Sequence, residues 1–427
     1  MSRRLASRAL TGAALVGALA VGPGTATAAP PSITAPAAAV IETSTGTVVY
    51  TKNAQQERGM ASTTKLMTAL VALDRRPLDS VLTAANYRPT AAETRLGLHA
   101  GERMTLADLV RAMMLPSAND AAQTVAQRTG GSVSRFVSLM NQRAKEEGLT
   151  HTRFTNPVGL DSSAHHTSAL DLARMGALAF DNPFLRQTVR RRSITLTSGD
   201  MARTITNRNT TLGVKLPGGG QINGMKTGHT NRSGYALVGS ATRGGVSVVS
   251  AVLGDPSEAA RDADTIKLLR WASGLFQRKQ VIRERAQVQR IGVDGGKVDS
   301  VELVAEQSLT RVVPRGEKIT LEPVGVPKLL QAPVAAGTKA GSARVLVGGK
   351  LVGTVPLVTA AAVEKQSLPA AIVSGIGDHW QGGLVALLLI LSGTLILVRA
   401  RNTRTPAPRT ATQGSPPAEP AERTTAP

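Results

Sequence analysis

Cysteine is absent from this 427-residue chain, and aromatic residues make up only 2% of it. The lack of cysteine excludes disulfides, thiol nucleophiles and cysteine-ligated metals, but it is compatible with any redox compartment. With so few aromatic rings, aliphatic side chains must supply most of the buried apolar surface. Hydrophobic residues nevertheless reach 42%, which is ample for a core, and the length favours two folded units.

Histidine is also scarce, and the six histidines show no metal-ligand spacing. No H-E-x-x-H motif is present, which disfavours a zinc enzyme. We therefore expect no metal site and no cofactor. The histidines are His99, His151, His165, His166, His229 and His379.

The N-terminus has the layout of a secretory signal. Three arginines precede an apolar stretch over residues 10–21, and the small-residue run Ala26-Thr27-Ala28 follows. This order of charged, hydrophobic and cleavable segments predicts a signal peptide at residues 1–28. The adjacent Arg3 and Arg4 leave twin-arginine export open beside the general secretory route.

Residues 380–398 form a charge-free, mostly apolar stretch near the other end of the chain. A helix of this length spans about 28 Å, which is enough to cross a bilayer core. Several arginines follow at once, which places the C-terminal side in the cytoplasm. We therefore expect a linker at 366–379, a single transmembrane helix at 380–398, a cytoplasmic basic, Pro-rich tail at 399–427, and an extracellular catalytic part.

The formal net charge is +21. A basic exterior face would be attracted to an anionic membrane or wall polymer, although an ordinary solvated arginine-rich surface is an equal alternative. Nucleic acid is not expected as a partner, because the chain has export signals and lacks a basic stripe interleaved with aromatics.

Residues 29–282 change from strand to helix and back to strand. Strand character occurs at 37–41, 46–50, 222–230, 234–241 and 246–253, the first two as a hairpin. Helical character occurs at 62–73, 106–115 after a capping box headed by Thr105, 134–147, a segment opened by Ser168, and 257–276. We expect an α+β domain, in which an antiparallel sheet is closed by the first and last segments beside a helical subdomain.

Residues 283–365 are dense in valine, glycine and proline. Strand candidates recur about every ten residues, which favours a small all-β sandwich. They lie at 287–293, 300–304, 309–313, 319–324, 342–347 and 351–358. No cluster of catalytic residue types occurs there, so we expect a spacer or interaction domain.

Three short motifs supply the parts of an acyl-transfer site. In chain order they are Ser62-Thr63-Thr64-Lys65, Ser117-Ala118-Asn119 and Lys226-Thr227-Gly228. They provide a hydroxyl nucleophile, an amine base, a polar proton relay and an anion-recognising strand. A lone Ser-x-x-Lys occurs by chance in many chains, so the combination carries the prediction that this chain is an enzyme.

Ser62 and Lys65 lie one helical turn apart, so both side chains share a face. A lysine acts as a base only when its pKa is lowered, by burial or by nearby positive charge. We expect Lys226 to supply that charge. The N-terminus of the helix also offers backbone N–H groups to an oxyanion.

The other two motifs are expected to relay protons and hold substrate. Ser117 would pass a proton to the leaving amine, and Asn119 would hold Lys65 and a substrate amide, although Ser-Ala-Asn alone is also a helix cap. Lys226 and Thr227 are suited to a carboxylate, and Gly228 to close approach of a substrate backbone.

The chain resembles the low-molecular-mass penicillin-binding proteins that are serine-type D-alanyl-D-alanine carboxypeptidases. The resemblance covers roughly residues 37–362 and extends beyond the three motifs. It also rests on the longer stretches Ala61–Ala69, Ser117–Ala122, Asn156-Pro-Val-Gly-Leu160, Asn207-Arg-Asn209 and Gly224-Met-Lys-Thr-Gly-His-Thr230.

The resemblance implies that Ser62 is acylated with Lys65 as base, and that Ser117, Asn119 and Lys226 arrange protons and substrate. It implies an oxyanion hole made by the backbone of Ser62 and His229, whose ring need not be catalytic. Substrate contacts are then expected from Thr227, Gly228, Thr230 and, by its spacing from Lys226, Arg261. Peptidoglycan stem peptides are the implied substrate, and β-lactams the implied covalent inhibitors. Family members commonly end in an amphipathic helix lying on the membrane, so the spanning helix expected here comes from this sequence alone.

The leading hypothesis is removal of the terminal D-alanine from peptidoglycan pentapeptides in cell-wall maturation. DD-endopeptidase or transpeptidase activity remains open, because all three share the acyl-enzyme. A class A β-lactamase is a further alternative, but its E-x-x-L-N stretch is missing, since the chain has no Leu-Asn dipeptide. An inactive, membrane-tethered wall-binding protein is the non-enzymatic alternative.

Overall fold

The computed structural model describes residues 29–366, 388 and 390–392. The expected signal peptide, the transmembrane segment and the tail therefore lie outside the described residues, apart from a few positions of 380–398. Within the part of the chain that is described, no helix is long and apolar enough to cross a membrane.

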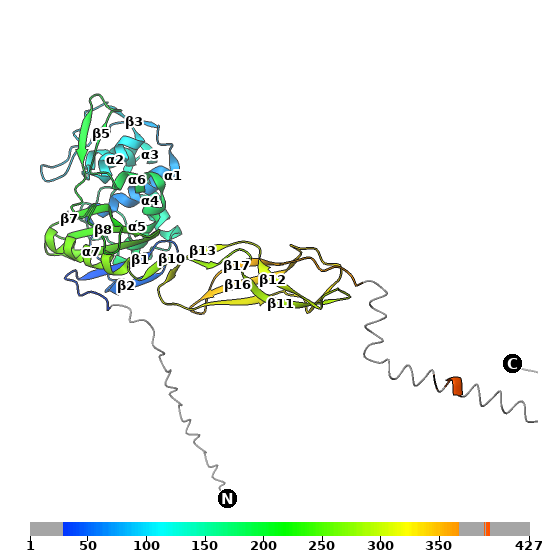
Figure 1. The fold of residues 1–427 in the computed structure, drawn as a ribbon. Helices are drawn as coiled ribbons and strands as arrows, with labels where there is room; N and C mark the ends of the chain where they lie inside the picture. The colour runs from blue at the N-terminus through cyan, green and yellow to red at the C-terminus, as the bar shows by residue number, and fades with distance from the viewer. Residues whose placement is uncertain (1–28, 367–387, 389, 393–427) are drawn as a thin grey trace, which may run out of the picture. The chain divides into compact units, whose positions relative to one another are not determined.

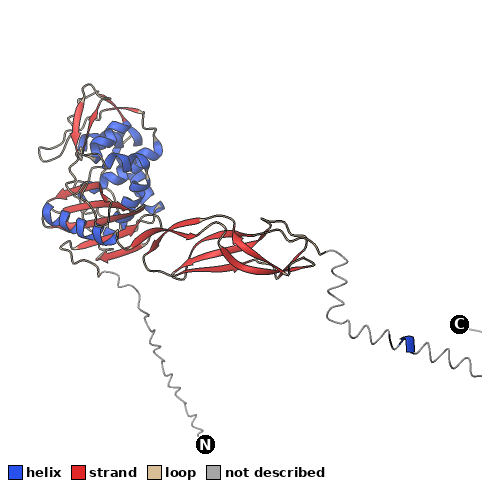
Figure 2. Cartoon of the chain, in the orientation of Figure 1, coloured by secondary structure: helices blue, strands red, loops and turns tan. Residues whose placement is uncertain are grey.

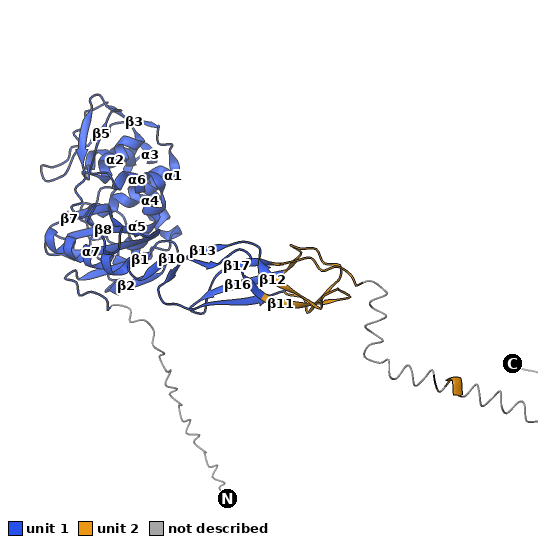
Figure 3. Cartoon of the chain, in the orientation of Figure 1, with its two compact units in different colours: residues 1–288, 304–325, 341–357 blue, residues 289–303, 326–340, 358–427 orange. Residues whose placement is uncertain are grey.

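The described chain divides into two compact units (Figure 3). The first contains the described residues up to Val288 together with Val304–Gly325 and Gly341–Leu357. The second contains Gln289–Leu303, Val326–Ala340 and the described residues from Val358 on. All of the predicted site residues belong to the first unit.

A five-stranded sheet forms the centre of the first unit (Figure 1). Its order is β2 (Val48–Lys52), β1 (Ala37–Glu42), β9 (Val246–Asp255), β8 (Gly234–Arg243) and β7 (Gln221–Thr230). All neighbouring strands are antiparallel. The prediction of an antiparallel sheet closed by the first and last segments is therefore confirmed, and β7 is left at one edge.

Helices cover both faces of this sheet. Ala39 on β1 packs in the core that includes helix α5 (Ala169–Asp181), whereas its neighbour Val40 packs with Leu268 of helix α7 (Glu258–Ala272). Successive strand residues point to opposite faces, so α5 and α7 lie on opposite sides. Both faces are consequently apolar, which explains why the strands read as nearly continuous hydrophobic runs.

The remaining helices form the predicted helical part, which Figure 2 shows in blue. Their bounds are η1 (Ala61–Thr64, a 3-10 turn), α1 (Lys65–Arg75), α2 (Leu106–Met114), α3 (Asn119–Gly130), α4 (Val133–Glu146) and α6 (Pro183–Val189). The Thr105 and Ser168 hydroxyls accept the backbone N–H groups of Asp108 and Asp171, so both predicted caps are present. Two short antiparallel pairs that the sequence did not predict join this part: β3 (Val81–Thr83) with β4 (Arg103–Thr105), and β5 (Ser193–Leu196) with β6 (Arg203–Thr206).

The predicted helix over 257–276 is too long. Helix α7 ends at Ala272, and Phe276 begins strand β10 (Phe276–Ile282). Gly274 comes just after the last turn of α7, where glycine commonly ends a helix. Phe276 is buried, so the apolar spacing continues past the end of the helix and made the predicted helix too long.

The C-terminal region is all-β, as predicted. In the first unit, β10 pairs with β13 (Leu309–Pro314), and β14 (Ile319–Val324) pairs with β16 (Lys339–Val347), both antiparallel. In the second unit, β11 (Gln287–Asp294) pairs in parallel with the short β15 (Leu329–Gln331). The other strands are β12 (Ser300–Ala305) and β17 (Lys350–Thr359).

Candidate active site

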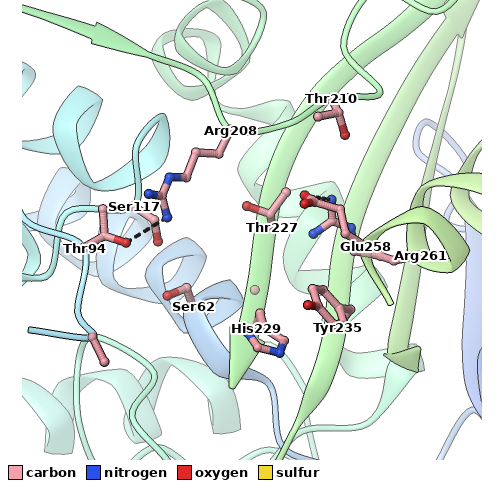
Figure 4. A pocket seen from close by; sticks show the side chains of 12 residues that line it. Ser62, Thr94, Ser117, Arg208, Thr210, Thr227, His229, Tyr235, Glu258 and Arg261 are labelled. Carbon is pink, nitrogen blue, oxygen red and sulfur yellow. Dashed lines mark hydrogen bonds and ion pairs between the residues drawn. The ribbon is translucent and has the colours of Figure 1, made fainter. Parts of the chain in front are cut away.

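The three motifs meet at one cavity of about 450 Å³ in the first unit (Figure 4). The cavity is lined from the 3-10 turn, the α2–α3 connection, strands β7 and β8, and helix α7. The lining residues are Ser62, Ala92, Thr94, Ser117, Arg208, Thr210, Thr227, Gly228, His229, Tyr235, Glu258 and Arg261. Six of the ten residues predicted for the site are among them.

Ser62 sits in the 3-10 turn directly before helix α1. The turn begins at Ala61, whose φ of 45° is in the left-handed region that a residue with a side chain rarely adopts. This backbone brings Ser62 Oγ to 3.0 Å from Nζ of Lys65, the first residue of α1. The predicted nucleophile and its predicted base are therefore in direct hydrogen-bond contact.

Lys65 is fully buried, and its amine also donates to the carbonyl of Val158 at 2.6 Å. Burial lowers the pKa of Lys65 to about 7, while the charges of Glu93 and Asp120 oppose that lowering. A large fraction of the amine is consequently neutral near neutral pH, as a general base for Ser62 requires.

The role expected for the Lys226 charge needs correction. Burial, followed by the charges of Lys65, Arg208 and Arg261, lowers the pKa of Lys226 well below the usual lysine value. Lys65 has carboxylates nearby that help it keep its proton, whereas Lys226 has guanidinium groups nearby. The repulsion between the two lysines therefore acts mainly on Lys226, and burial is the main reason that Lys65 can be neutral.

Ser117 has a strained backbone and a hydroxyl without a partner. Its φ is 70°, and its buried Oγ makes no hydrogen bond to any described residue. Figure 4 shows the side chain facing the same cavity as Ser62. Strain of this kind costs on the order of 1–3 kcal/mol, and it is retained where a side chain must be aimed at a site.

Asn119 is the first residue of helix α3 and is held by the loop between β3 and β4. Its Nδ2 donates to Glu93 Oε2 at 2.6 Å, and its backbone N–H donates to the carbonyl of Thr94 at 2.8 Å. Nothing in the pattern around Glu93 indicated this contact, because the loop has neither helical nor strand periodicity.

Strand β7 forms a wall of the cavity. A Cβ atom at Gly228 would lie 3.1 Å from the carbonyl oxygen of Met60 and 3.2 Å from the backbone nitrogen of Ser62. The missing side chain thus lets the strand approach the nucleophile turn itself, which is a different reason for glycine from the expected approach of substrate. The His229 ring stacks on Tyr235 at 4.0 Å between centroids.

Lys226 and Thr230 do not line the cavity. The Lys226 side chain is buried, and its amine donates to the carbonyl of Thr227 at 2.9 Å. The Thr230 hydroxyl donates to Asp161 at 2.9 Å and accepts the backbone N–H of Ser233. Thr230 therefore shapes the end of β7 in this structure.

Two arginines face the cavity, and only one of them is paired with carboxylates of the described chain. Arg261 donates to Glu258 at 2.7 Å and to Asp262 at 2.7 and 2.9 Å. Arg208 donates to Thr94 Oγ1 at 2.9 Å and has no carboxylate partner among the described residues. Arg208 belongs to the noted Asn-Arg-Asn stretch, which was the available signal for this residue.

The Asn156-Pro-Val-Gly-Leu160 stretch supports the catalytic turn from behind. Asn156 Oδ1 accepts the backbone N–H groups of Val158, Gly159 and Leu160, which fixes the Val158 carbonyl that receives Lys65. Gly159 has a φ of 94°, and a Cβ there would lie 2.0 Å from the Ala61 carbonyl oxygen. Only glycine fits this position.

No group of three or more side chains suited to holding a metal ion occurs in the described residues. The arrangement is that of a serine acylated with help from an amine, flanked by cations that suit an anionic substrate.

Comparison with known proteins agrees with this geometry. The model of the D-alanyl-D-alanine carboxypeptidase family matches residues 24–257, and that of the C-terminal domain of penicillin-binding protein 5 matches residues 276–365. The D-alanyl-D-alanine carboxypeptidase DacD of Salmonella typhimurium is 31% identical, over 82% of this chain and 91% of that protein.

Two solved structures are similar as well. Penicillin-binding protein 6B from Escherichia coli is 27% identical with a TM-score of 0.60, covering 78% of this chain and 98% of that one. The DD-transpeptidase of Streptomyces K15 is 31% identical with a TM-score of 0.54, covering 58% of this chain and 100% of that one.

The fold and site are those of a serine acyl-transfer enzyme. The chain belongs to the D-alanyl-D-alanine carboxypeptidase family, and both the family and the enzyme class expected from the sequence are confirmed.

Proposed function

We propose that this enzyme removes the terminal D-alanine from peptidoglycan pentapeptides through an acyl-enzyme on Ser62. The observation that carries the proposal is the 3.0 Å contact between Ser62 Oγ and the Lys65 amine, whose pKa is lowered to about 7 by burial. The nucleophile and a base of suitable proton affinity are thus already in contact.

Acylation follows from this contact. Neutral Lys65 takes the Ser62 proton as Oγ attacks the carbonyl carbon of the penultimate D-alanine, and the negative charge moves to the carbonyl oxygen. We assign the backbone N–H groups of Ser62 and His229 as the donors to that oxygen. The amide C–N bond then breaks, and Ser117 relays the proton held by Lys65 to the departing nitrogen of the terminal D-alanine, which returns Lys65 to its neutral form.

Hydrolysis completes the cycle. Water adds to the ester carbonyl as Lys65 accepts one of its protons, and the Ser62 oxygen leaves and is reprotonated. The cationic side of the cavity suits the terminal carboxylate of the substrate. Arg208 has no carboxylate partner there, whereas Arg261 would have to share its existing pairs with Glu258 and Asp262.

A fluorescent penicillin and a pentapeptide test the proposal on the same purified protein. Ser62→Ala should abolish both covalent labelling and release of D-alanine. Ser138→Ala, an exposed serine on helix α4, should retain both. Labelling of the Ser62 variant would remove Ser62 from its role, and rapid turnover of penicillin by the native enzyme would favour a β-lactamase.

A cross-linked muropeptide and a D-amino acid acceptor distinguish the acyl-transfer outcomes. The similarity to a structure described as a DD-transpeptidase makes acceptor choice a specific question. Cleavage of the cross-link would establish endopeptidase activity, and exchange of the terminal residue would establish transpeptidation. Binding without any D-alanine release would establish the inactive wall-binding alternative.

We further infer that the enzyme is exported and held at the cell membrane with its catalytic part outside. The signal-like residues 1–28 and the apolar residues 380–398 followed by arginines support this inference. A chain ending at residue 379 should then move from the membrane fraction to the medium. Retention of that chain on the membrane would contradict the inferred anchor.

A further inference from the structure

A carboxylate that no motif indicated lies beside the catalytic groups. Glu93 belongs to the loop between β3 and β4 and accepts a hydrogen bond from Asn119 Nδ2 at 2.6 Å. It also accepts from the Thr90 backbone N–H at 3.0 Å and from the Tyr87 hydroxyl. Glu93 is thus held by several donors from its own loop while it contacts the second motif.

The loop itself is fastened to helix α3 by a different acid. Asp120 accepts the backbone N–H groups of Leu96 and Gly97 at 2.8 Å each, and that of Leu98 at 3.1 Å. Asp120 therefore fastens the 96–98 part of the loop to α3, separately from the contact of Glu93 with Asn119.

The contact with Glu93 determines which way the Asn119 amide points. An ionised carboxylate only accepts hydrogen bonds, so it must face the NH₂ end of the amide. The oxygen of Asn119 is then directed away from Glu93 and is available to accept a hydrogen bond from a substrate N–H. A neutral amide in place of Glu93 would allow either orientation.

The charged groups around Lys65 come from three elements. Glu93 lies on the loop and Asp120 on α3, and both favour the protonated amine. Lys226 lies on β7, and the Lys65 charge lowers the pKa of Lys226. Burial disfavours ionisation of Glu93, yet its bonds from Tyr87, Thr90 and Asn119 lower its pKa below the usual value. Glu93 therefore remains anionic where the enzyme works.

We propose that Glu93 is a positioning residue for acylation: its carboxylate orients the Asn119 amide and places a negative charge beside the Lys65 amine. This inference rests on the proposed function of the site. No bond forms to Glu93, and it acts on the reaction only through these two groups.

Glu93→Gln is the direct test, with acylation by a fluorescent penicillin measured from pH 5 to pH 9. The second-order rate constant should fall on the order of tenfold, because a freely rotating amide misplaces the reacting groups. The acid limb of the profile should move to lower pH, because the lost negative charge no longer raises the pKa of Lys65. Glu146→Gln, an exposed residue on α4, is the matched control and should change neither quantity.

Tyr87→Phe separates the effect of Glu93 on the Asn119 orientation from the effect of its charge on Lys65. It also provides a test if the Glu93→Gln variant does not fold. It removes one donor to Glu93 but keeps the charge, so the rate should fall modestly while the acid limb stays in place. In an Asn119→Ala background, Glu93→Gln should lose its effect on rate but keep its effect on the limb. A fixed acid limb in Glu93→Gln, or an unchanged rate constant, overturns the inference; loss of labelling in the native enzyme would instead overturn the proposed function.

Discussion

His165 Nε2 lies 2.8 Å from Oγ1 of Thr64, in the middle of a directed chain of hydrogen bonds. The Thr155 backbone N–H can only donate, so it makes His165 Nδ1 an acceptor at 3.0 Å and leaves the proton on Nε2. Nε2–H then donates to Thr64, whose hydroxyl donates to the Ala61 carbonyl at 2.8 Å. Burial lowers the pKa of His165 to about 4, so the ring stays neutral and the chain keeps its direction.

We predict that breaking this chain slows acylation without removing a reacting group. His165→Asn keeps an acceptor for Thr155 but does not reach Thr64, and Thr64→Val removes the hydroxyl while keeping the shape. Each should lower the acylation rate constant on the order of tenfold. Ala61 directly precedes Ser62, so a shift of the Ala61 carbonyl would move the nucleophile. The double variant should be little worse than either single one. Stopped-flow labelling measures this, and fully additive losses would show that the two residues act separately.

The acylation rate of the native enzyme should rise with pH with a midpoint near 7. The pKa of Lys65 is lowered to about 7 by burial, and only the neutral amine accepts the Ser62 proton. Below this midpoint the protonated amine predominates and the rate should fall about tenfold per pH unit. Labelling rates across pH in a constant-ionic-strength buffer check the prediction, and a flat profile down to pH 5 would contradict it.

Gly228→Ala should impair the site although it changes no polar atom. The added methyl would meet the Met60 carbonyl oxygen and the Ser62 backbone nitrogen at 3.1 and 3.2 Å, so the nucleophile turn or β7 must move by a few tenths of an ångström. We expect kcat/KM for D-alanine release to fall on the order of tenfold to a hundredfold.

Gly292→Ala is its matched control. It is also a strand substitution, but the added Cβ meets mainly the end of the flexible Leu329 side chain, which can turn aside. It should leave turnover unchanged. Equal losses in the two variants would assign the effect to general destabilisation rather than to the nucleophile turn.

Asp255→Asn should stabilise the protein above pH 7. Asp255 is fully buried beside Asp264, which accepts the backbone N–H groups of Thr34 and Ala35 and pairs with Lys267 at 3.6 Å. Burial and then the Asp264 charge raise the pKa of Asp255 to about 7, so the folded state binds more protons than the unfolded state between about pH 4 and pH 7. Stability therefore falls as pH rises through this window.

Urea unfolding at pH 5 and pH 8 measures the effect. The asparagine variant should gain on the order of 2 kcal/mol over the native chain at pH 8 and much less at pH 5. Asp181→Asn, an exposed residue at the end of α5, should show no such difference. An equal effect of Asp255→Asn at pH 5 and pH 8 would contradict a raised pKa of Asp255 in the folded state.

The sequence predicted what depends on local pattern and on motif. The caps at Thr105 and Ser168, the five sheet strands and the serine–lysine pair all follow from spacing and periodicity. The contact of Glu93 with Asn119 could not be predicted, because it joins an irregular loop to a helix through side chains alone. The sequence predicted a lowered pKa of Lys65 but named the Lys226 charge as its cause, whereas the cause in the structure is burial. Burial and neighbouring charges depend on the packed structure and cannot be read from spacing.

The pairing of β1 with β9 joins the beginning of the domain to its end, with Val40 opposite Ser250. Strands β8 and β7 attach beyond β9, so the wall that faces Ser62 is joined to β1 only through this late segment. Contacts between such distant segments slow folding, because the loop must close before any of them form. A chain that ends between β7 and β9 would therefore carry the nucleophile, its base and the wall strand β7, but it would lack the strand that joins β8 to β1.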